Sequence, residues 1–311
     1  MKKPIIGITL GEPAGIGPEV VAKALKKPAI RGLADFVVIG DGAVYQRYSS
    51  RASSCCNFLD LKKISKKDFH LGRPNSQSAA ASIAYLNAAV DLLKQKKIQA
   101  LVTAPVCKEA ITALGRPFPG HTEFLAQAFR IKNFEMMFVS KTLRTVIVTR
   151  HLAIKDVPKA LNKNKILRTL LLTNAALTKH FGIKRPRLAV TGLNPHAGEG
   201  GTIGKEELTT VIPAIKEARE KGLNVIGPAA ADTLFTPLTG QDYDCVVAMY
   251  HDQGLIPIKT LDFRNVVNLT IGLPFVRTSP AHGTAFNIAG QNKADPSSMI
   301  AAIRLAATLK P

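Results

Sequence analysis

Three histidines follow short apolar runs of the sequence, each near the point where a buried strand would end. They are His151, His196 and His251, and the run before the last of them is residues 245–249. Ligands of open α/β sheets bind beyond the carboxyl ends of the strands, so histidines at such positions are candidates for a site. Neutral imidazole is the commonest nitrogen ligand of metals, and three protein ligands leave one position open for a substrate. The pattern therefore predicts that the three histidines converge on one divalent metal.

Other candidates lie at the ends of loops. His121 and Thr122 stand at a junction between a loop and a helix, where an imidazole, a hydroxyl and free backbone N–H groups suit an anion such as phosphate or carboxylate. Alternatively, Thr122 only caps the helix. Asp232 follows a short strand and could be catalytic, associated with the metal, or only a cap. The residues alone leave these alternatives open.

Strand and helix patterns alternate along the whole chain. An opening strand at residues 4–10 leads through the glycine-rich turn 11–19 into a helix, with Pro18 suited to a first helical position and Glu19 to the positive helix end. The turn lacks the GxGxxG spacing, so it is not a Rossmann fingerprint. The alternation predicts a layered α/β/α protein, and the absence of a low-complexity linker predicts that any second domain is inserted into the first.

The composition narrows the class of protein. Of the 311 residues, 46% are hydrophobic, and no apolar run approaches the length that spans a bilayer, so we expect a soluble protein without a membrane partner. The basic start is followed by too short an apolar stretch for a signal peptide. The cysteines show no CxxC spacing and favour a reducing cytoplasm; they are Cys55, Cys56, Cys107 and Cys245.

The net charge of +20 raises the question of an anionic partner. The lysines are spread along the chain with few aromatic residues between them, and no helix-turn-helix, zinc-finger or RNP-type signature accompanies them. We therefore expect a solvated basic face that also attracts anionic substrates, with nucleic acid binding as a distant alternative.

Seven motifs in the sequence resemble the 4-hydroxythreonine-4-phosphate dehydrogenase family of pyridoxal phosphate biosynthesis. They cover the chain from end to end and keep the order of the family. They are GEPAGIGPE at 11–19, GHTEF at 120–124, NPHAGE at 194–199, ADT at 231–233, YHDQG at 250–254, RTS at 277–279 and HGTA at 282–285.

The resemblance implies a homodimer with the isocitrate/isopropylmalate dehydrogenase-like fold, in which two α/β/α domains have the active-site cleft between them. Residues 1–130 and 265–311 would form the first domain, on the cofactor side, and residues 131–264 the second, on the metal and dimer side. In such dimers the metal site is completed across the subunit interface, so dimerisation would be a condition of activity.

The resemblance also implies the roles of particular residues. The metal ligands would be His151, His196 and His251, and the metal zinc, cobalt or magnesium. The substrate contacts would be His121, Thr122, Lys259, Asn268 and Arg277. The candidates for acid–base work are Lys259, Asp252 and Asp232, although Asp252 could equally fix the tautomer of His251. The cofactor contacts would be Gly11, Glu12, Gly15, His282, Gly283, Thr284 and Asn287.

The implied reaction is the oxidation of 4-phosphohydroxy-L-threonine by NAD or NADP to 2-amino-3-oxo-4-phosphobutanoate, which decarboxylates to 3-amino-2-oxopropyl phosphate. Asn287 and Ile288 offer neither an acidic partner for a free ribose nor a basic one for a 2′-phosphate, so the choice of nucleotide stays open. Cys107 departs from the common family pattern and receives no role. The alternatives are a sister dehydrogenase acting on 4-phosphothreonate, phosphoerythronate or a diol, and a phosphate acyltransferase of the same broad fold.

Overall fold

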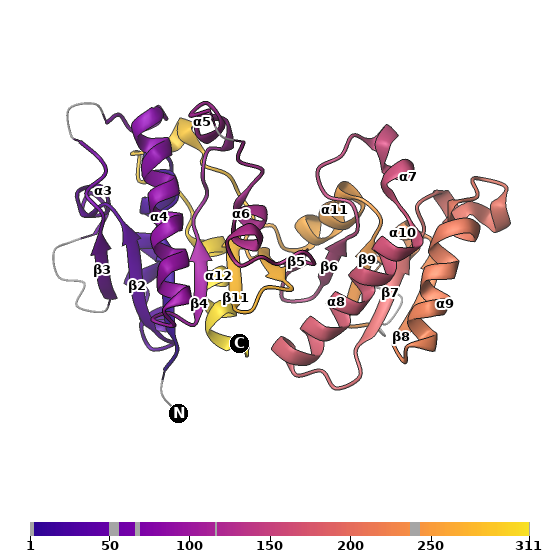
Figure 1. Ribbon diagram of the computed structural model, residues 1–311. Helices are drawn as coiled ribbons and strands as arrows, with labels where there is room; N and C mark the ends of the chain where they lie inside the picture. The colour runs from indigo at the N-terminus through magenta and orange to yellow at the C-terminus, as the bar shows by residue number, and fades with distance from the viewer. Residues whose placement is uncertain (1–2, 50–55, 66–68, 116, 237–242, 311) are drawn as a thin grey trace. The chain divides into compact units, whose positions relative to one another are not determined.

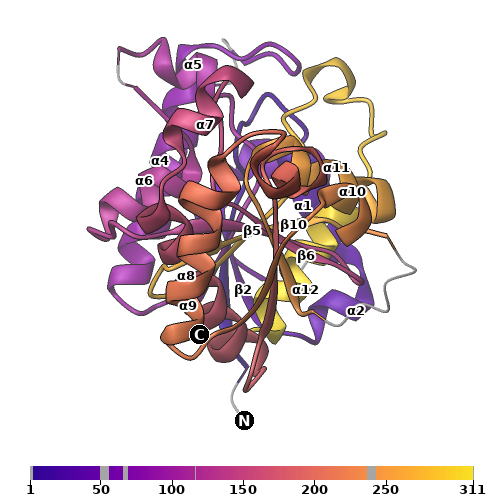
Figure 2. The same ribbon diagram turned by 90° about the vertical axis from the view of Figure 1, so that its right-hand side faces the viewer.

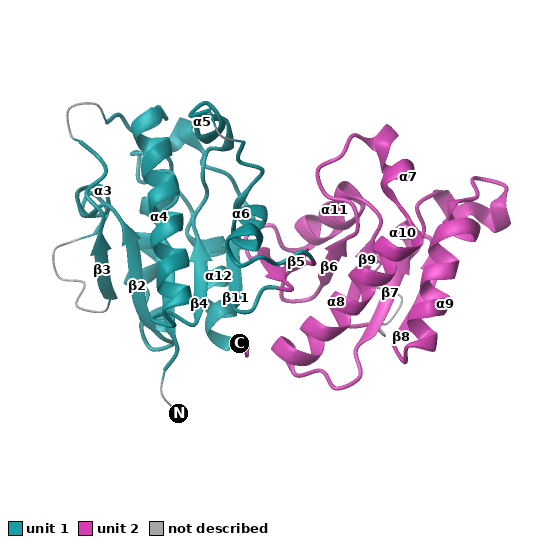
Figure 3. Ribbon diagram, viewed as in Figure 1, with its two compact units in different colours: residues 1–132, 273–309, 311 teal, residues 133–272, 310 magenta. Residues whose placement is uncertain are grey.

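The structure is a computed structural model that describes residues 3–49, 56–65, 69–115, 117–236 and 243–310 (Figure 1). The chain divides into two compact units. Unit 1 contains residues 1–132, 273–309 and 311, and unit 2 contains residues 133–272 and 310 (Figure 3). Each unit contains its own strands and its own helices.

Unit 1 is built on a parallel sheet with the strand order β3-β2-β1-β4-β11. Ile6 at the centre pairs with Phe36 on one side and Ala100 on the other. Every residue of β4 and β11 is buried, as expected for strands covered on both faces. The strands are β1 (Ile5–Thr9), β2 (Asp35–Gly40), β3 (Cys56–Asp60), β4 (Ala100–Thr103) and β11 (Val276–Pro280).

Helices cover both faces of this sheet. Figure 2 shows α4 on one side of β2, and α1, α2 and α12 on the other. Helix α4 contacts β1 and β2, while α12 contacts β4 and β11. The helices of unit 1 are α1 (Gly17–Lys26), α2 (Pro28–Arg31), α3 (Gly42–Tyr45), α4 (Ser76–Lys94), α5 (Lys108–Thr112), α6 (His121–Ala128), the 3₁₀ turn η5 (Phe286–Ile288) and α12 (Ser297–Thr308).

The long helix α4 shows how local sequence defines an element. Asn75 accepts a hydrogen bond from the backbone N–H of Ser78, and the Ser78 hydroxyl accepts one from the backbone N–H of Asn75, which forms a capping box. Ala79, Leu86 and Leu93 recur at a spacing of seven and are buried, so they lie on one face of the helix. Ala79 and Leu86 pack against Ile111 of α5 and against Phe118, so this face joins α4 to α5 and the segment that follows it.

Unit 2 is built on a mixed sheet with the strand order β10-β5-β6-β9-β7-β8. Strand β5 is antiparallel to both β10 and β6, and the remaining pairs are parallel. The strands are β5 (Glu135–Val139), β6 (Arg144–Ile147), β7 (Arg187–Thr191), β8 (Asn224–Ala229), β9 (Cys245–Ala248) and β10 (Val267–Ile271).

Helices α8 and α9 pack on each other on one side of this sheet, and α10 and α11 lie on the other side (Figure 2). The buried strands β6, β7 and β9 form its centre. The helices and turns of unit 2 are η1 (Ile154–Asp156), α7 (Val157–Ala160), α8 (Lys163–Phe181), η2 (Pro195–Gly201), the π-helical turn η3 (Glu207–Val211), α9 (Ile212–Glu220), α10 (Ala231–Leu234) and α11 (His251–Asp262).

The layered α/β class predicted from the strand and helix patterns is confirmed in each unit. The division of the chain differs from the expected one at residues 265–272. These residues were expected in the first domain, but β10 is hydrogen-bonded to β5, with Asn268 opposite Phe138, and it therefore belongs to unit 2.

Within the described residues, no helix is long and apolar enough to cross a membrane. Among the described residues, Cys107 and Cys245 are free thiols. Cys55 lies outside the described residues.

Candidate active site

The ends of strands β6 and β9 in unit 2 bring two of the predicted metal ligands together. The two strands run parallel, and beyond them the backbone N–H of Thr149 donates to the carbonyl of Met249 at 3.1 Å. The Thr149 hydroxyl donates to the same carbonyl at 2.7 Å. The imidazole rings of His151 and His251 consequently lie 5.7 Å apart between centroids, at an interplanar angle of 43°.

This pair of rings fits one metal ion. Two imidazoles on a single tetrahedral ion have ring centres about 5 Å apart, close to the observed separation. Nδ1 of His251 lies 2.7 Å from a carboxylate oxygen of Asp252. Because an ionised carboxylate only accepts hydrogen bonds, Nδ1 carries the proton, and the lone pair of Nε2 is left for a ligand bond. Asp252 therefore sets the tautomer of His251.

His196, the third predicted ligand, is held apart from this pair in the described chain. It lies exposed in the turn η2, which follows β7. Among the described residues, no group of three or more His, Cys, Asp or Glu side chains is close enough to hold a metal. In the described chain, His151 and His251 thus lie together without His196.

Gln253 ties the ends of these strands to one another. Its Oε1 accepts hydrogen bonds from the Thr191 hydroxyl and the Met249 backbone N–H, both at 2.7 Å, and its Nε2 donates to the carbonyl of Gly192 at 2.7 Å. All of its amide atoms are therefore used in joining the end of β7 to the start of α11. The sequence places Gln253 in the YHDQG motif but indicates no role for it.

In unit 1, Arg277 is a buried cation at the centre of a second group of polar residues. It lies on β11, is 2% exposed, and donates to the hydroxyls of Thr103 at 2.6 Å and Thr122 at 3.4 Å. Burial lowers its pKa to about 10, so it keeps its charge at neutral pH. A buried guanidinium that contacts neutral hydroxyl groups is suited to bind a phosphate or carboxylate.

His121 lies beside this cation as the first residue of α6. Burial, Arg277 and Lys108 together hold the pKa of His121 well below its ordinary value. The edge of its ring faces Phe118, with the centroids 6.2 Å apart, and within the described residues its Nε2 is buried without a hydrogen-bond partner. A neutral imidazole with an unused nitrogen can bind a polar group of a ligand without adding charge.

The lowered pKa of His121 predicts a pH dependence of stability. The stability that its neutral form contributes is fully present above the unfolded pKa of about 6.5, and it is lost as pH falls, because the unfolded chain takes up a proton that the folded chain resists. For each pH unit between the unfolded and the folded pKa, the free energy of unfolding falls by at most about 1.4 kcal/mol, which lowers Tm by roughly 2–4 °C. The variant His121→Asn should therefore lose less in Tm than the wild type between pH 7.5 and 5.

Differential scanning calorimetry at several pH values measures this difference. The exposed His70 supplies the matched control, because His70→Asn should leave the pH slope of Tm unchanged. Equal slopes for His121→Asn and the wild type would contradict a neutral His121.

The two segments expected to bind the nucleotide lie side by side in unit 1. The backbone N–H of Ile16 donates to the carbonyl of Thr284 at 3.0 Å. A Cβ atom at Gly15 would lie 2.9 Å from the same carbonyl oxygen, so only glycine fits there without displacing the backbone. The glycine-rich turn and the HGTA segment are thus in direct backbone contact.

Glu12 and Gly11 shape the inner side of this turn. Glu12 is 0% exposed; its carboxylate accepts hydrogen bonds from the backbone N–H of Ala14 at 3.1 Å and the hydroxyl of Ser82 at 3.4 Å, and burial raises its pKa. Gly11 has φ +68°, and a Cβ there would lie 2.3 Å from the carbonyl oxygen of Pro105. Both residues fix the turn against its neighbours.

His282 begins the HGTA segment, and Asn287 follows it by two residues. Nδ1 of His282 donates to the carbonyl of Gly283 at 2.9 Å, and burial lowers the pKa of the ring. Its Nε2 is buried and has no hydrogen-bond partner in the described part of the chain. Asn287 is exposed, and its carbonyl accepts a hydrogen bond from Gln291. The neutral His282 therefore offers an acceptor to a ligand.

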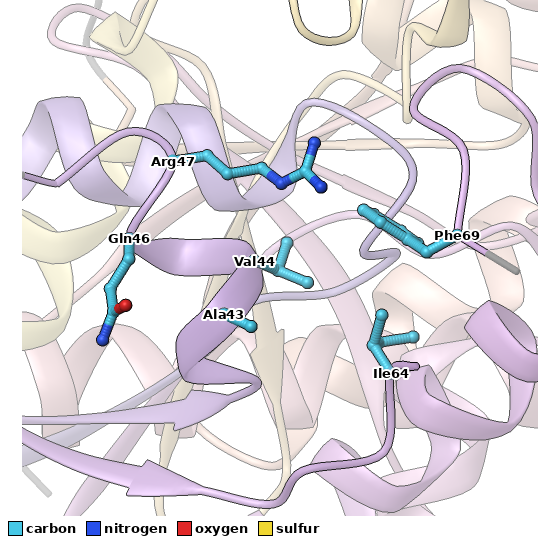
Figure 4. Close-up of a pocket in the computed structure, with 6 residues that line it drawn as sticks. All are labelled: Ala43, Val44, Gln46, Arg47, Ile64 and Phe69. Atoms are coloured by element: carbon cyan, nitrogen blue, oxygen red, sulfur yellow. The ribbon is translucent and has the colours of Figure 1, made fainter. Parts of the chain in front are cut away.

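A hollow of about 370 Å³ lies in unit 1 next to this region (Figure 4). The guanidinium of Arg47 stacks over the ring of Phe69 at 5.3 Å from its centroid. Val44 and Phe69 belong to a small core that also contacts Phe286, one residue before Asn287. The hollow contains none of the predicted site residues; its lining is Ala43, Val44, Gln46, Arg47, Ile64 and Phe69.

The remaining predicted residues lie in unit 2. Lys259 is half-buried on α11, eight positions after His251, and Asn268 is half-buried on β10 with its Oδ1 unpartnered among the described residues. Asp232 is exposed on α10, which contacts the turn η2 that carries His196. Of the predicted substrate contacts, His121, Thr122 and Arg277 lie close together in unit 1.

Sequence reasoning gave no role to three residues that the structure places at these sites. Thr103 binds Arg277, Lys108 faces His121 and Gln253 joins the strand ends. Thr103 ends a buried strand, and a hydroxyl at that position was a usable signal. Lys108 and Gln253 depend on contacts between distant segments, for which the sequence carries no local signal.

The family model of PdxA, described as pyridoxal phosphate biosynthetic protein PdxA, matches residues 23–306 of the chain. A protein of Desulforapulum autotrophicum named 4-hydroxythreonine-4-phosphate dehydrogenase is 42% identical, with 98% of this chain and 95% of that protein covered. The crystal structure of the Klebsiella pneumoniae protein of the same name has a TM-score of 0.88 at 37% identity, covering 97% of this chain and 98% of that chain.

Two more distant structures place the chain in a wider group. A terephthalate 1,2-cis-dihydrodiol dehydrogenase from Burkholderia xenovorans has a TM-score of 0.68 at 32% identity, with 98% of both chains covered. A β-decarboxylating dehydrogenase from Thermococcus kodakarensis has a TM-score of 0.53 at 14% identity, covering 99% of this chain and 82% of that chain, and shares the fold. The resemblance inferred from the motifs is confirmed: the chain belongs to the PdxA family of pyridoxal phosphate biosynthetic proteins.

Proposed function

We propose that this protein is a 4-hydroxythreonine-4-phosphate dehydrogenase that requires a divalent metal and NAD or NADP. The observation that carries the proposal is the pair of imidazoles, His151 and His251, at the carboxyl ends of neighbouring strands. A metal bound there would act as a Lewis acid on the alcohol that is oxidised. Zinc, cobalt and magnesium are the candidates for this ion, and nitrogen ligands favour the first two.

The substrate 4-phosphohydroxy-L-threonine carries a phosphate, a carboxylate and a secondary alcohol. Arg277 supplies a fixed positive charge for one anionic group, with Thr122 and the neutral His121 beside it. Lys259 and Asn268 of unit 2 are proposed as further contacts. The net charge of +20 attracts such an anion from a distance.

The reaction proceeds in two stages. The hydrogen on the alcohol carbon leaves as hydride to the nicotinamide, and the hydroxyl proton goes to a base, for which Lys259 and Asp232 are candidates. Asp252 contacts Nδ1 of His251 at 2.7 Å, which favours a role in orienting that ring. The resulting β-keto acid then loses carbon dioxide. A proton added to the carbon that carried the carboxylate gives 3-amino-2-oxopropyl phosphate.

Unit 1 is proposed as the nucleotide-binding side. Gly11 and Gly15 are buried and let neighbouring backbone pack closely against the glycine-rich turn. His282, Gly283, Thr284 and Asn287 lie in or just after the segment that contacts this turn. Glu12 shapes the turn from within, because its carboxylate is buried in hydrogen bonds to Ala14 and Ser82. These features support binding of a dinucleotide, in which either NAD or NADP is the hydride acceptor.

We propose further that the active form is a homodimer assembled through unit 2 in the cytoplasm. Large apolar side chains are exposed immediately after His151 and along or just after α11, which begins at His251. Their exposed fractions range from 45% to 71%, and such surfaces favour association with a second chain. They are Leu152, Ile154, Ile256, Leu261 and Phe263. A second protomer would also offer a route for His196 to complete the ligand set.

The test is NADH or NADPH formation from 4-phosphohydroxy-L-threonine by metal-loaded enzyme, followed at 340 nm. We expect turnover with at least one nucleotide, its loss after EDTA treatment, and its return on adding zinc or cobalt. The product 3-amino-2-oxopropyl phosphate is identified by mass spectrometry. Turnover only with a cis-dihydrodiol or with 4-phosphothreonate, in a protein that binds metal, would replace the proposed substrate with one of those compounds.

A further inference from the structure

The turn that carries His196 has an unusual backbone. Five consecutive residues adopt left-handed conformations, with φ of 52° at His196, 53° at Ala197, 79° at Gly198, 44° at Glu199 and 66° at Gly200. Three of the five are not glycine, and an L-residue in this region brings its Cβ close to the following carbonyl oxygen. Such a run does not persist through local preference, so other contacts must hold it.

Glu207 supplies the contacts that hold the start of this turn. It is 2% exposed, and its Oε1 accepts hydrogen bonds from the backbone N–H groups of Leu193 at 2.7 Å and Asn194 at 2.8 Å. Its Oε2 accepts a third from Nδ2 of Asn194 at 2.9 Å. Three charge-assisted hydrogen bonds donated to one buried carboxylate fix the two residues that precede Pro195.

The same carboxylate also packs inside the turn. A Cβ atom at Gly198 would lie 2.6 Å from Oε2 of Glu207, and one at Gly192 would lie 3.1 Å from Oε1. The loop therefore closes around the carboxylate on both sides of His196. Glu207 begins the π-helical turn η3, a type of helical irregularity that occurs frequently at functional sites.

We infer that Glu207 is a positioning residue that holds residues 193–200 in the left-handed turn and thereby sets the place of His196 for metal binding. The inference deepens the proposed function, because it rests on His196 as a metal ligand. Glutamine at this position keeps the size of the side chain, but one oxygen becomes an NH₂ group that faces the donor Nδ2 of Asn194. The turn should then be held less firmly while the surrounding core stays intact.

Glu206 provides a matched control. It is the neighbour of Glu207 in sequence and accepts from the same Nδ2 of Asn194, at 2.8 Å. Among the described residues, the backbone N–H groups of Leu193 and Asn194 donate to Glu207 and not to Glu206. Glu206 is also more exposed than Glu207. The variant Glu206→Gln thus removes a carboxylate beside the turn without removing the one that holds its backbone.

The first measurement is hydrogen exchange by mass spectrometry on the full-length protein without added metal. In Glu207→Gln, we expect peptides that cover residues 192–204 to exchange at least about tenfold faster, because backbone N–H groups lose a charged acceptor. In Glu206→Gln, the same peptides should exchange as in the wild type. Unchanged exchange in Glu207→Gln, or equal acceleration in both variants, overturns the inference.

The second measurement is Co²⁺ binding, followed through the visible absorption of the bound ion. We expect Glu207→Gln to weaken Co²⁺ affinity by about 10–100-fold and to change the absorption spectrum toward that of His196→Ala, at an unchanged Tm. The double variant should bind Co²⁺ no more weakly than His196→Ala alone. Additive losses in the double variant would show that Glu207 does not act through His196, and would overturn the inference.

The two measurements separate this inference from the proposed function. If His196→Ala binds Co²⁺ as tightly as the wild type, the metal role proposed for His196 is wrong, whatever the exchange data show. If His196→Ala binds Co²⁺ weakly and Glu207→Gln does not, the proposed function stands and the positioning role of Glu207 fails. If Glu207→Gln folds poorly, Glu207→Asp replaces it in the test, because aspartate retains the charge. We expect Glu207→Asp to show hydrogen exchange and Co²⁺ affinity between those of the wild type and Glu207→Gln.

Discussion

The variant His251→Ala should lose roughly 1,000-fold or more in kcat/KM for 4-phosphohydroxy-L-threonine, together with most of its metal affinity. Lewis-acid catalysis by a bound metal contributes several kcal/mol to the transition state, and each 1.36 kcal/mol is about tenfold in rate. His251 and His151 are the two imidazoles that lie close enough to share an ion in one protomer. Steady-state kinetics with saturating Zn²⁺ or Co²⁺, beside metal analysis of the dialysed protein, measures both losses.

Two variants calibrate this result. His70→Ala changes an exposed histidine of unit 1 and should leave both kinetics and metal content unchanged. Asp252→Asn removes the carboxylate that orients the ring, at 2.7 Å from Nδ1, and should cost about 10–100-fold in metal affinity. A His251→Ala protein that retains wild-type metal affinity would remove the histidine pair from the site.

The second large effect is expected at Arg277. Replacing it with methionine, which keeps much of the side-chain volume, should raise KM by about 100-fold or more, because truncating one partner of a buried charged pair typically costs 2–5 kcal/mol. Arg277→Lys should recover only part of this loss, since an ammonium group cannot reproduce the fork of donors that contacts Thr103 and Thr122. The measurement is KM and kcat for the phosphorylated substrate at saturating nucleotide.

Arg304 on α12 is the matched control for this pair of variants, because it is an exposed arginine in the same unit. Arg304→Met should leave KM unchanged. An Arg277→Met enzyme with a wild-type KM would show that the buried guanidinium has a structural role and does not bind substrate. The Tm of Arg277→Met measures the structural cost separately, because methionine removes the hydrogen bonds to the buried hydroxyls of Thr103 and Thr122.

Much of the site could be found from the order of residue types along the chain. Apolar runs mark buried strands, and polar residues directly after them mark the carboxyl edge of a parallel sheet. This reasoning selected His151 and His251, which the structure brings together, and the loop-to-helix junction at His121, which lies beside Arg277. The motifs then identified the family without reference to any distance.

The sequence could not supply the order of the strands. His151 and His251 are neighbours because β6 pairs with β9, although their residues are about one hundred positions apart and β7 lies between them in the chain. Residues 265–272 belong to unit 2 because β10 pairs with β5, and a half-buried strand reads the same whichever partner it has. Gln253 and Thr103 gain their roles only from such pairings.

What the sequence by itself determined was the class of each local element, the chemistry gathered at its ends and the family to which the chain belongs. The tertiary structure decided which of those ends meet, and it revealed that Glu207 is buried beneath the turn of His196. The physical reason is range. Helix and strand periodicity and capping act between residues a few positions apart, whereas strand pairing and the burial of a carboxylate depend on segments brought together only when the chain folds.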